Sequence, residues 1–335
     1  MSSLRQDPTT NEWVIVAPDR KRREMQFKEE VRHLILPEFS DVCPFCPGHE
    51  DKSPDVILSF PEKRKKGEGW KVLVLPNKYP ALRPEGSLER RQDGWFRRSM
   101  DGVGKHEVIV ETPLHNRFIS QMDYSEVEDI IWVLQERYDE LSTDPRFALI
   151  MIFQNHGGTA GTSLIHPHSQ IIATPVVPAE IRQKLEVATN YYDDSGRCVY
   201  IDIVVDELAA GDRIVAESDG FVVFQPFASR YPYETWIAPR EHCASFGQAT
   251  DDQLKELARV LRDTLRRLYI LLNDPDYNLV IHTSPLGDEN KQYYLWHIQI
   301  VPRLTTPAGF EMGSGMNINT AFPEETAAQL RKVEI

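Results

Sequence analysis

The sequence predicts an α+β protein made of two similar halves, residues 1–185 and 186–335. Each half is expected to be an antiparallel sheet with helices, and the two sheets can run into one another. Two observations predict this fold. The chain has 335 residues, 41% apolar and 27% charged, which is enough for two ordinary domains with substantial cores. The same ordered series of strand and helix patterns also occurs twice along the chain.

Each half opens with an apolar strand, continues with a long amphipathic helix, and closes with two more strands, the last of which carries histidine. Capping boxes mark the start of both helices, Ser125 with Glu128 in the first half and Thr250 with Gln253 in the second. The paired strand patterns are 72–76 and 222–226, 147–153 and 279–281, and 166–175 and 296–302. Chance explains one such match more easily than the whole ordered series.

Two polar stretches interrupt this pattern. Residues 84–104 are charged and contain several glycines, so we expect an exposed excursion there. Residues 185–215 are polar and mixed, and the run Asp193-Asp194-Ser195-Gly196 predicts a turn. We therefore place the boundary between the two halves in this second stretch.

The charge balance narrows the classes of partner. The chain has 51 acidic and 38 basic residues, a formal charge of −13, which argues against nucleic acid or an anionic membrane surface as its main partner. A small phosphorylated ligand remains compatible. No apolar stretch approaches the ~20 residues that span a bilayer, and residues 1–10 lack the apolar core of a secretory signal. Four cysteines are too few for a disulfide scaffold, so we expect a cytoplasmic protein.

A run of polar side chains, His166-Pro167-His168-Ser169-Gln170, begins the strand that closes the first half. Strand alternation places His166, His168 and Gln170 on one face. A single buried histidine is usually just hydrogen-bonded, but three aligned polar groups are costly to bury without partners. The pattern therefore favours a ligand site.

A glycine-rich segment, residues 155–163, precedes this run by three residues. Its glycines permit positive φ angles, and successive backbone N–H groups in such a loop can form an anion site. Alone it predicts only a turn; beside an imidazole it predicts a phosphate cradle. A neutral imidazole suits attack on phosphorus when its other nitrogen is held by a hydrogen bond. The Gln170 amide can donate to a phosphoryl oxygen and stabilise developing charge.

The pair Cys43-x-x-Cys46 needs two more ligands to make a closed zinc site. His115 and His166 can complete a Cys2His2 set, but spacing alone does not select them, and His49 is a nearby competitor. A metal on His166 would fix the strand next to His168. A redox role is the weaker alternative, because nothing around the pair resembles a thioredoxin βαβ unit.

Further motifs accompany these features along nearly the whole chain. They are Asp7-Pro8, Trp13–Val16 with Arg20, Asn77–Ala81, Phe153–Asn155 with Gly161–Ser163, and Trp296-His297 with Pro302. In this order, together with the His-Pro-His-x-Gln run and the cysteine pair, they resemble the galactose-1-phosphate uridylyltransferase family of the histidine-triad superfamily. The resemblance implies a duplicated fold, a possible homodimer, and a nucleotidyltransferase of galactose and other carbohydrate metabolism.

The resemblance also implies a ping-pong reaction. His168 would take a nucleoside monophosphate from a nucleotide sugar such as UDP-glucose, release a sugar 1-phosphate, and pass the nucleotide to a second hexose 1-phosphate. Gln170 would contact the transferred phosphoryl group. The residues implied to bind the phosphates are Asn155, Gly161 and Ser163, with added charge from Arg20 and Arg23.

Three further sites follow from the resemblance. Asn77 would lie against the nucleoside, and Phe310 with Glu311 would hold the hexose. The implied zinc ligands are Cys43, Cys46, His115 and His166. A second metal site is an open alternative. It would lie near His282 and His297, or it would be formed by Cys198, His242 and His297. The simpler interpretation is that these histidines are buried and hydrogen-bonded without a metal.

The second half departs from the pattern at its closing strand. Matching Pro175 with Pro302 places His297 at the position of Gln170 and Leu295 at that of His168. On this alignment the second half has no nucleophile, and only the first half is expected to be catalytic.

The segment that the resemblance assigns to sugar binding also departs from the family pattern. Thr305 and Thr306 stand where a lysine is expected, and residues 313–319 resemble a branch that includes ADP-glucose phosphorylase. That branch transfers adenylyl groups to phosphate, which is the first alternative function. A histidine-triad hydrolase that uses water as acceptor is the second. A zinc-containing nucleotide-sugar-binding module without catalysis is the third.

Overall fold

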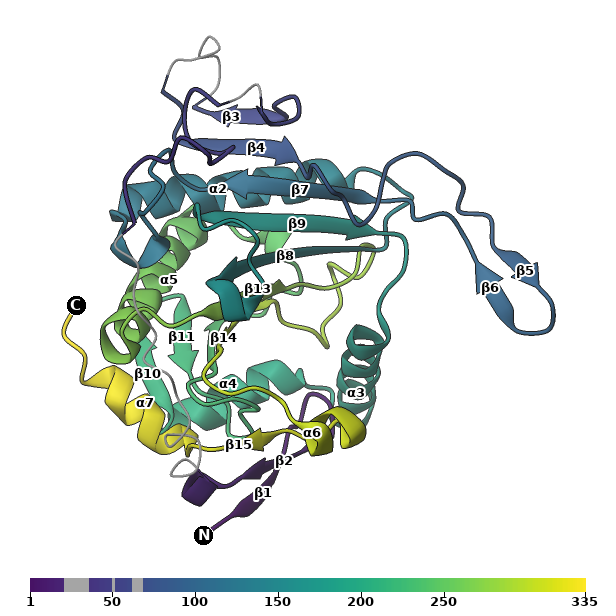
Figure 1. Ribbon diagram of the computed structural model, residues 1–335. Helices are drawn as coiled ribbons and strands as arrows, with labels where there is room; N and C mark the ends of the chain where they lie inside the picture. The colour runs from purple at the N-terminus through teal and green to yellow at the C-terminus, as the bar shows by residue number, and fades with distance from the viewer. Residues whose placement is uncertain (21–35, 50–51, 62–68) are drawn as a thin grey trace.

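A computed structural model describes residues 1–20, 36–49, 52–61 and 69–335. Its main feature is one 10-stranded sheet in the order β10-β11-β12-β14-β13-β8-β9-β7-β4-β3 (Figure 1). The strands in this order are β10 (Ile214–Glu217), β11 (Phe221–Phe224), β12 (Thr235–Pro239), β14 (His297–Pro302), β13 (Tyr277–His282), β8 (Leu149–His156), β9 (His168–Thr174), β7 (Lys105–Val110), β4 (Val72–Pro76) and β3 (Leu58–Phe60).

The sheet shows the predicted duplication directly. Each half contributes five strands, and the two sets have the same order from the edge of the sheet to its centre: β3, β4, β7, β9 and β8 in the first half, and β10, β11, β12, β14 and β13 in the second. All neighbouring pairs are antiparallel. The two halves join where β8 pairs with β13, with Asn278 opposite Asn155. The α+β class and the continuous sheet are therefore confirmed.

Two long helices cover one face of the sheet, α2 (Tyr124–Ser142) and α5 (Asp251–Leu272). Their apolar sides enter the main hydrophobic core together with the inward side chains of the sheet, such as Ile152 and Ile281. Thr250 caps α5 and forms the predicted box with Gln253. Helix α2 starts two residues earlier than predicted, because the box is made by Asp123 and Glu126, whose carboxylate accepts the Asp123 N–H at 2.8 Å.

Residues 185–215 contain more regular structure than the sequence analysis expected. They belong mainly to two helices, α3 (Ala179–Ser195) and α4 (Val199–Ala210), which cover the other face of the second half. Gly196 is not part of a separate turn but ends α3 in the left-handed conformation, with φ of 70°. The sparse apolar residues of α3 hid its helical period. A boundary between residues 185 and 186 would cut this helix.

The remaining elements lie at the periphery. A 3-stranded sheet is formed by β1 (Ser3–Gln6), β2 (Trp13–Val16) and β15 (Ile318–Asn319), with helices α6 (Gly309–Ser314) and α7 (Pro323–Arg331) on either side of β15 in the sequence. The short 3₁₀ helices are η1 (Pro18–Arg20), η3 (Ile119–Gln121), η4 (Gly158–Ala160) and η5 (Phe246–Gln248). In the described part of the chain, no helix has the length and apolarity of a membrane span.

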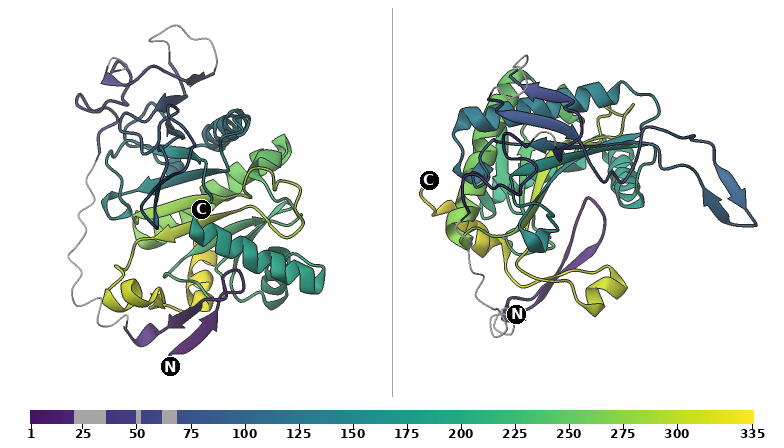
Figure 2. Two further views of the ribbon diagram at one scale, coloured as in Figure 1. Left: turned by 90° about the vertical axis from the view of Figure 1, so that its right-hand side faces the viewer. Right: turned by 45° about the horizontal axis from the view of Figure 1, so that its top comes forward.

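The expected excursion at residues 84–104 is an exposed hairpin. Strands β5 (Arg91–Asp93) and β6 (Arg97–Ser99) project away from the body of the molecule (Figure 2). The tip carries two aromatic side chains, Trp95 and Phe96, which are 91% and 87% exposed.

Candidate active site

His168 and Gln170 point into a cavity of about 460 Å³ on the face of the sheet that α2 and α5 leave open. Both lie on β9, whose alternation turns Ser169 and Ile171 to the opposite face. The cavity is lined by residues of four segments: Pro44, Phe45, Lys52, Ser53, Pro54, Leu75, Pro76, Asn77, Lys78, Tyr79, Val108, Gly161, Ser163, Leu164, His168 and Gln170. Lys52, Lys78 and Phe45 were not singled out from the sequence as cavity residues.

The His168 ring is oriented for chemistry at one nitrogen. Its Nδ1 donates to the His166 carbonyl at 2.8 Å, so Nε2 carries the free lone pair. Burial lowers the pKa of His168, which favours the neutral, nucleophilic imidazole. Phe45 packs on this ring with its centroid 5.5 Å away. An imidazole held in this way at a cavity wall can attack an electrophile.

The glycine-rich loop reaches the same cavity through Gly161 and Ser163. Gly157 has a φ of 84°, and a Cβ there would lie 1.8 Å from Asp276 Oδ1, so only glycine fits. Asp276 in turn accepts the N–H and hydroxyl of Thr159, both at 2.6 Å. This carboxylate of the second half anchors the loop, a contact that sequence reasoning missed.

Part of the expected backbone cradle is used within the loop itself. The N–H groups of Ala160 and Gly161 donate to the carbonyls of Gly157 and Gly158 at 3.2 and 3.1 Å. Asn155, which was expected to bind the phosphates, is not among the residues that line the cavity, and its Oδ1 accepts from Asn278 Nδ2 at 2.8 Å.

A buried carboxylate supports β9 from behind. Glu111 accepts from Ser169 Oγ at 2.5 Å and from Gln154 Nε2 at 2.7 Å, and Gln154 Oε1 accepts from Tyr277 at 2.9 Å. Burial raises the pKa of Glu111 to about 7. The network ties β9 to β8 and β13 directly beneath His168 and Gln170.

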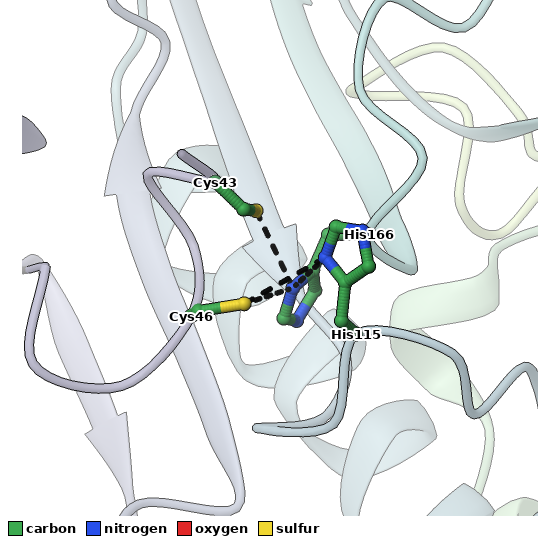
Figure 3. A group of neighbouring side chains, drawn as sticks. All are labelled: Cys43, Cys46, His115 and His166. Carbon is green, nitrogen blue, oxygen red and sulfur yellow. Dashed lines mark hydrogen bonds between the residues drawn. The ribbon is translucent and has the colours of Figure 1, made fainter. Parts of the chain in front are cut away.

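Four buried ligand-type side chains converge next to this cavity: Cys43, Cys46, His115 and His166 (Figure 3). Their ligand atoms all lie within 4.8 Å of one another. His166 Nε2 donates to the Thr112 carbonyl at 2.7 Å, which leaves its Nδ1 for a metal. The structure therefore brings together the four residues that the resemblance implied.

The separations suit a tetrahedral ion. Zinc–sulfur bonds of about 2.3 Å and zinc–nitrogen bonds of about 2.0 Å give tetrahedral edges of roughly 3.3–3.8 Å. Cys43 Sγ and Cys46 Sγ lie 3.6 and 3.7 Å from His166 Nδ1, and the two Nδ1 atoms lie 3.3 Å apart. The side chains present thus fit a structural zinc ion.

His49 is not a member of this group. Its Nδ1 lies 2.6 Å from the Cys43 carbonyl oxygen, so it braces the loop instead. Nor do the described residues place the other candidate sets, His282 with His297 or Cys198, His242 and His297, in a group of three metal ligands. His282 bonds to Gln299 Oε1 at 2.9 Å, which fits the simpler interpretation of a hydrogen-bonded histidine.

Comparison with known proteins places this site in a family. A model of the N-terminal domain of galactose-1-phosphate uridyl transferase matches residues 1–178, and a model of its C-terminal domain matches residues 184–333. The chain belongs to the galactose-1-phosphate uridylyltransferase family. The predicted family and the predicted class, a hexose-1-phosphate nucleotidyltransferase, are therefore confirmed.

Named relatives of this family differ in their reactions. The chain is 35% identical to an ADP-glucose phosphorylase of Arabidopsis thaliana, over 99% of this chain and 93% of the relative. It is 29% identical to a galactose-1-phosphate uridylyltransferase of Thermotoga maritima, over 100% and 99% of the two chains. The crystal structure of an Arabidopsis thaliana ADP-glucose phosphorylase with bound ADP-glucose matches with a TM-score of 0.84 at 33% identity, covering all of both chains.

The second half contains a counterpart of the family's His-x-Gln pair. His297 begins β14 as His168 begins β9, and its Nδ1 lies 3.0 Å from the Leu295 carbonyl oxygen, as His168 contacts the carbonyl two residues earlier. His297 thus matches His168, and the alignment that paired it with Gln170 is wrong by two residues. The cause is that Pro302 is the last residue of β14, whereas Pro175 follows the end of β9.

This second imidazole is closed off from solvent. His297 is 1% exposed and stacks between Trp236 and His282, with centroid distances of 4.4 and 4.8 Å. Burial lowers the pKa of His297 to about 3. Helices α3 and α4 cover this face, so a nucleotide has no room beside the ring. Steric closure, rather than a missing histidine, distinguishes the second half.

The residues expected to bind the hexose and to add charge do not line the His168 cavity. Phe310 and Glu311 lie on α6, at the opposite end of the molecule from β4 (Figure 1). The Glu311 carboxylate accepts the N–H groups of Ala308 and Ile318 at 2.9 and 3.2 Å. Arg20 is exposed on η1, and Arg23 lies outside the described residues.

Proposed function

We propose that the chain transfers a nucleoside monophosphate from a nucleotide sugar to His168 and then to a phosphate acceptor. One observation carries this proposal. The free Nε2 of His168 faces a cavity that also presents Gln170, Gly161 and Ser163. Two lysines, Lys52 and Lys78, line the same cavity and suit the charge of a diphosphate.

In the first step, His168 Nε2 attacks the α-phosphorus of the nucleotide sugar. A P–N bond forms, the bond from phosphorus to the bridging oxygen breaks, and sugar 1-phosphate leaves with that electron pair. The proton on Nδ1 stays on its hydrogen bond to the His166 carbonyl, which stabilises the positive charge on the ring. Gln170 donates to a phosphoryl oxygen as charge develops there.

In the second step, a phosphate oxygen of the acceptor attacks the same phosphorus. The P–N bond breaks, and its electron pair returns to Nε2, so the starting imidazole is restored. We assign Asn77 to the nucleoside, because it lines the cavity next to Gln170. Gly161 and Ser163, which line the cavity, would hold the phosphates.

We propose that zinc binds Cys43, Cys46, His115 and His166, where it would supply rigidity rather than reactivity. The loop between the two cysteines carries Phe45, which packs on His168, and His166 lies two residues before it. The ligands therefore hold two neighbours of the nucleophile in place. None of the four cysteines forms a disulfide, and we propose the cytoplasm, where thiols stay reduced, as the site of action.

Two candidate reactions remain, which differ in the base of the nucleotide donor and in the acceptor. The two matching domain models are those of a galactose-1-phosphate uridyl transferase, which supports uridylyl transfer. The identity of 35% with an ADP-glucose phosphorylase, against 29% with the uridylyltransferase from Thermotoga maritima, favours adenylyl transfer to orthophosphate.

The deciding assay offers UDP-glucose or ADP-glucose, each with galactose 1-phosphate or with orthophosphate. The account predicts ping-pong kinetics with one donor, at a rate at least about tenfold above that with the other, and turnover that requires a phosphate acceptor. Release of sugar 1-phosphate at the same rate without any acceptor would instead identify a hydrolase. Tight donor binding with no turnover in any combination would identify a binding module.

We further propose that the active form is a homodimer. The sugar-end residues Phe310 and Glu311 stand away from the cavity of their own chain, and Trp95 with Phe96 forms an exposed aromatic tip. A second copy would both cover this tip and complete the site.

The dimer is tested by sedimentation at micromolar concentration. The chain of 38.6 kDa should sediment at twice that mass. A variant with Trp95→Ser and Phe96→Ser should shift toward monomer, because the apolar contact is lost. Val205→Ser, on an exposed site of α4, is the matched control and should stay dimeric. A wild-type monomer would contradict the proposal.

A further inference from the structure

Three polar side chains meet at one edge of the cavity: His106 on β7, Asn77 after β4, and Gln170 on β9. His106 Nε2 lies 2.8 Å from Gln170 Oε1, and Asn77 Nδ2 lies 3.4 Å from the same oxygen. The two nitrogens lie 3.1 Å apart. Amide orientation and histidine tautomer must be decided from the whole network, because shape alone does not distinguish them.

Two backbone N–H groups decide the tautomer of His106 and the amide orientation of Asn77. The N–H of Ala81 points at His106 Nδ1 at 3.1 Å, and the N–H of Tyr79 points at Asn77 Oδ1 at 2.8 Å. A backbone N–H only donates. His106 Nδ1 is therefore an acceptor, and the ring proton sits on Nε2. Asn77 likewise turns its NH2 group toward Gln170.

Both side chains thus direct donors at one atom of Gln170, and that atom must be the amide oxygen. The short distance between His106 Nε2 and Asn77 Nδ2 separates two donors that share this acceptor. With its oxygen held, Gln170 turns its NH2 group the other way, and the side chain lines the cavity with His168. Burial lowers the pKa of His106, which keeps the ring in this single-proton form.

We propose that His106 is a positioning residue that fixes the Gln170 amide with its NH2 group toward the transferred phosphoryl group. The inference rests on the proposed function and deepens it. A flipped amide would present a carbonyl oxygen to the phosphoryl oxygens and repel the charge that develops there. A donor that is already oriented needs no reorganisation during the reaction, and removing one such donor typically costs about 10²–10³ in rate.

The test is a double-mutant cycle on the single-turnover rate of covalent adduct formation with the preferred nucleotide sugar. His106→Phe keeps a ring of similar size but removes the N–H that donates to Gln170. We expect a rate of adduct formation about 10- to 100-fold lower, with little change in the affinity for the nucleotide sugar. His106→Gln, which can accept from Ala81 and donate to Gln170, should recover part of this loss. In a Gln170→Ala background, His106→Phe should slow the reaction by less than about twofold.

Other outcomes separate the possible failures. If the two substitutions multiply each other's effects, His106 acts independently of Gln170 and the inference is overturned. If His106→Phe lowers the melting temperature while His106→Gln restores stability but not rate, the role is structural and the inference is also overturned. If the wild-type protein forms no adduct with either donor, the proposed function fails first and the inference falls with it.

Discussion

Replacing His168 by asparagine should lower turnover by at least about a thousandfold, because the reaction loses the atom that forms the P–N bond. Asparagine can keep a hydrogen bond toward the His166 carbonyl, so the strand and the metal group should be undisturbed. The melting temperature and the affinity for the nucleotide sugar should therefore change little. Steady-state rates, thermal melting and titration calorimetry check the three parts of this prediction.

The second half of the chain supplies a matched control. His297 makes the same contact with the carbonyl two residues earlier, yet it is stacked among aromatic rings and faces no cavity. His297→Asn should therefore leave the rate per folded molecule within about twofold of wild type, although it removes buried ring contacts and can lower stability. Equal loss of activity in the two variants would refute the assignment of His168 as the nucleophile.

Replacing Cys46 by serine should remove the bound metal and destabilise the fold together. A thiolate is the ligand zinc prefers, and a hydroxyl in its place leaves a buried, incomplete site. We expect a metal content near zero and a melting temperature lower by about 5–10 °C, which corresponds to several kcal/mol. Adduct formation should also slow, because Phe45 and His166 would no longer be held against His168.

Cys243→Ser is the control for this experiment. Cys243 is half-buried and lies outside the four-residue group, so its substitution should leave one metal ion per chain. Metal content is measured by plasma mass spectrometry on protein purified without chelators. A Cys46→Ser protein that retains a full equivalent of zinc would contradict the ligand assignment, whatever its stability.

The parts of the fold that the sequence could predict are those with strong local patterns. The strand that carries His168 and the helix capped by Thr250 both follow from alternation or from a capping box. Helix α3 was missed because few of its residues are buried, among them Ile181, Lys184 and Ala188, so its apolar period is faint. This helix is held by packing against the sheet of the second half, and no local sequence pattern indicates that contact.

The site was predictable only where its residues share a strand or a motif. His168 and Gln170 stand two apart on β9, and alternation places them together. His106 lies on a different strand and contacts Gln170 only because β7 pairs with β9 with Val108 opposite Gln170. Asp276 reaches the glycine-rich loop from the other half. Such contacts depend on strand order and register, which the sequence alone left open.

The central claim is that one imidazole nitrogen, His168 Nε2, holds the nucleotide between two half-reactions. Intact-mass spectrometry of the wild-type chain after incubation with UDP-glucose or ADP-glucose tests it most directly. The account predicts the added mass of one uridylyl or adenylyl group, located on the peptide that contains His168, and its removal by a sugar 1-phosphate or by orthophosphate. A chain that consumes donor and acceptor yet stays unlabelled, or carries the label on another residue, would contradict it.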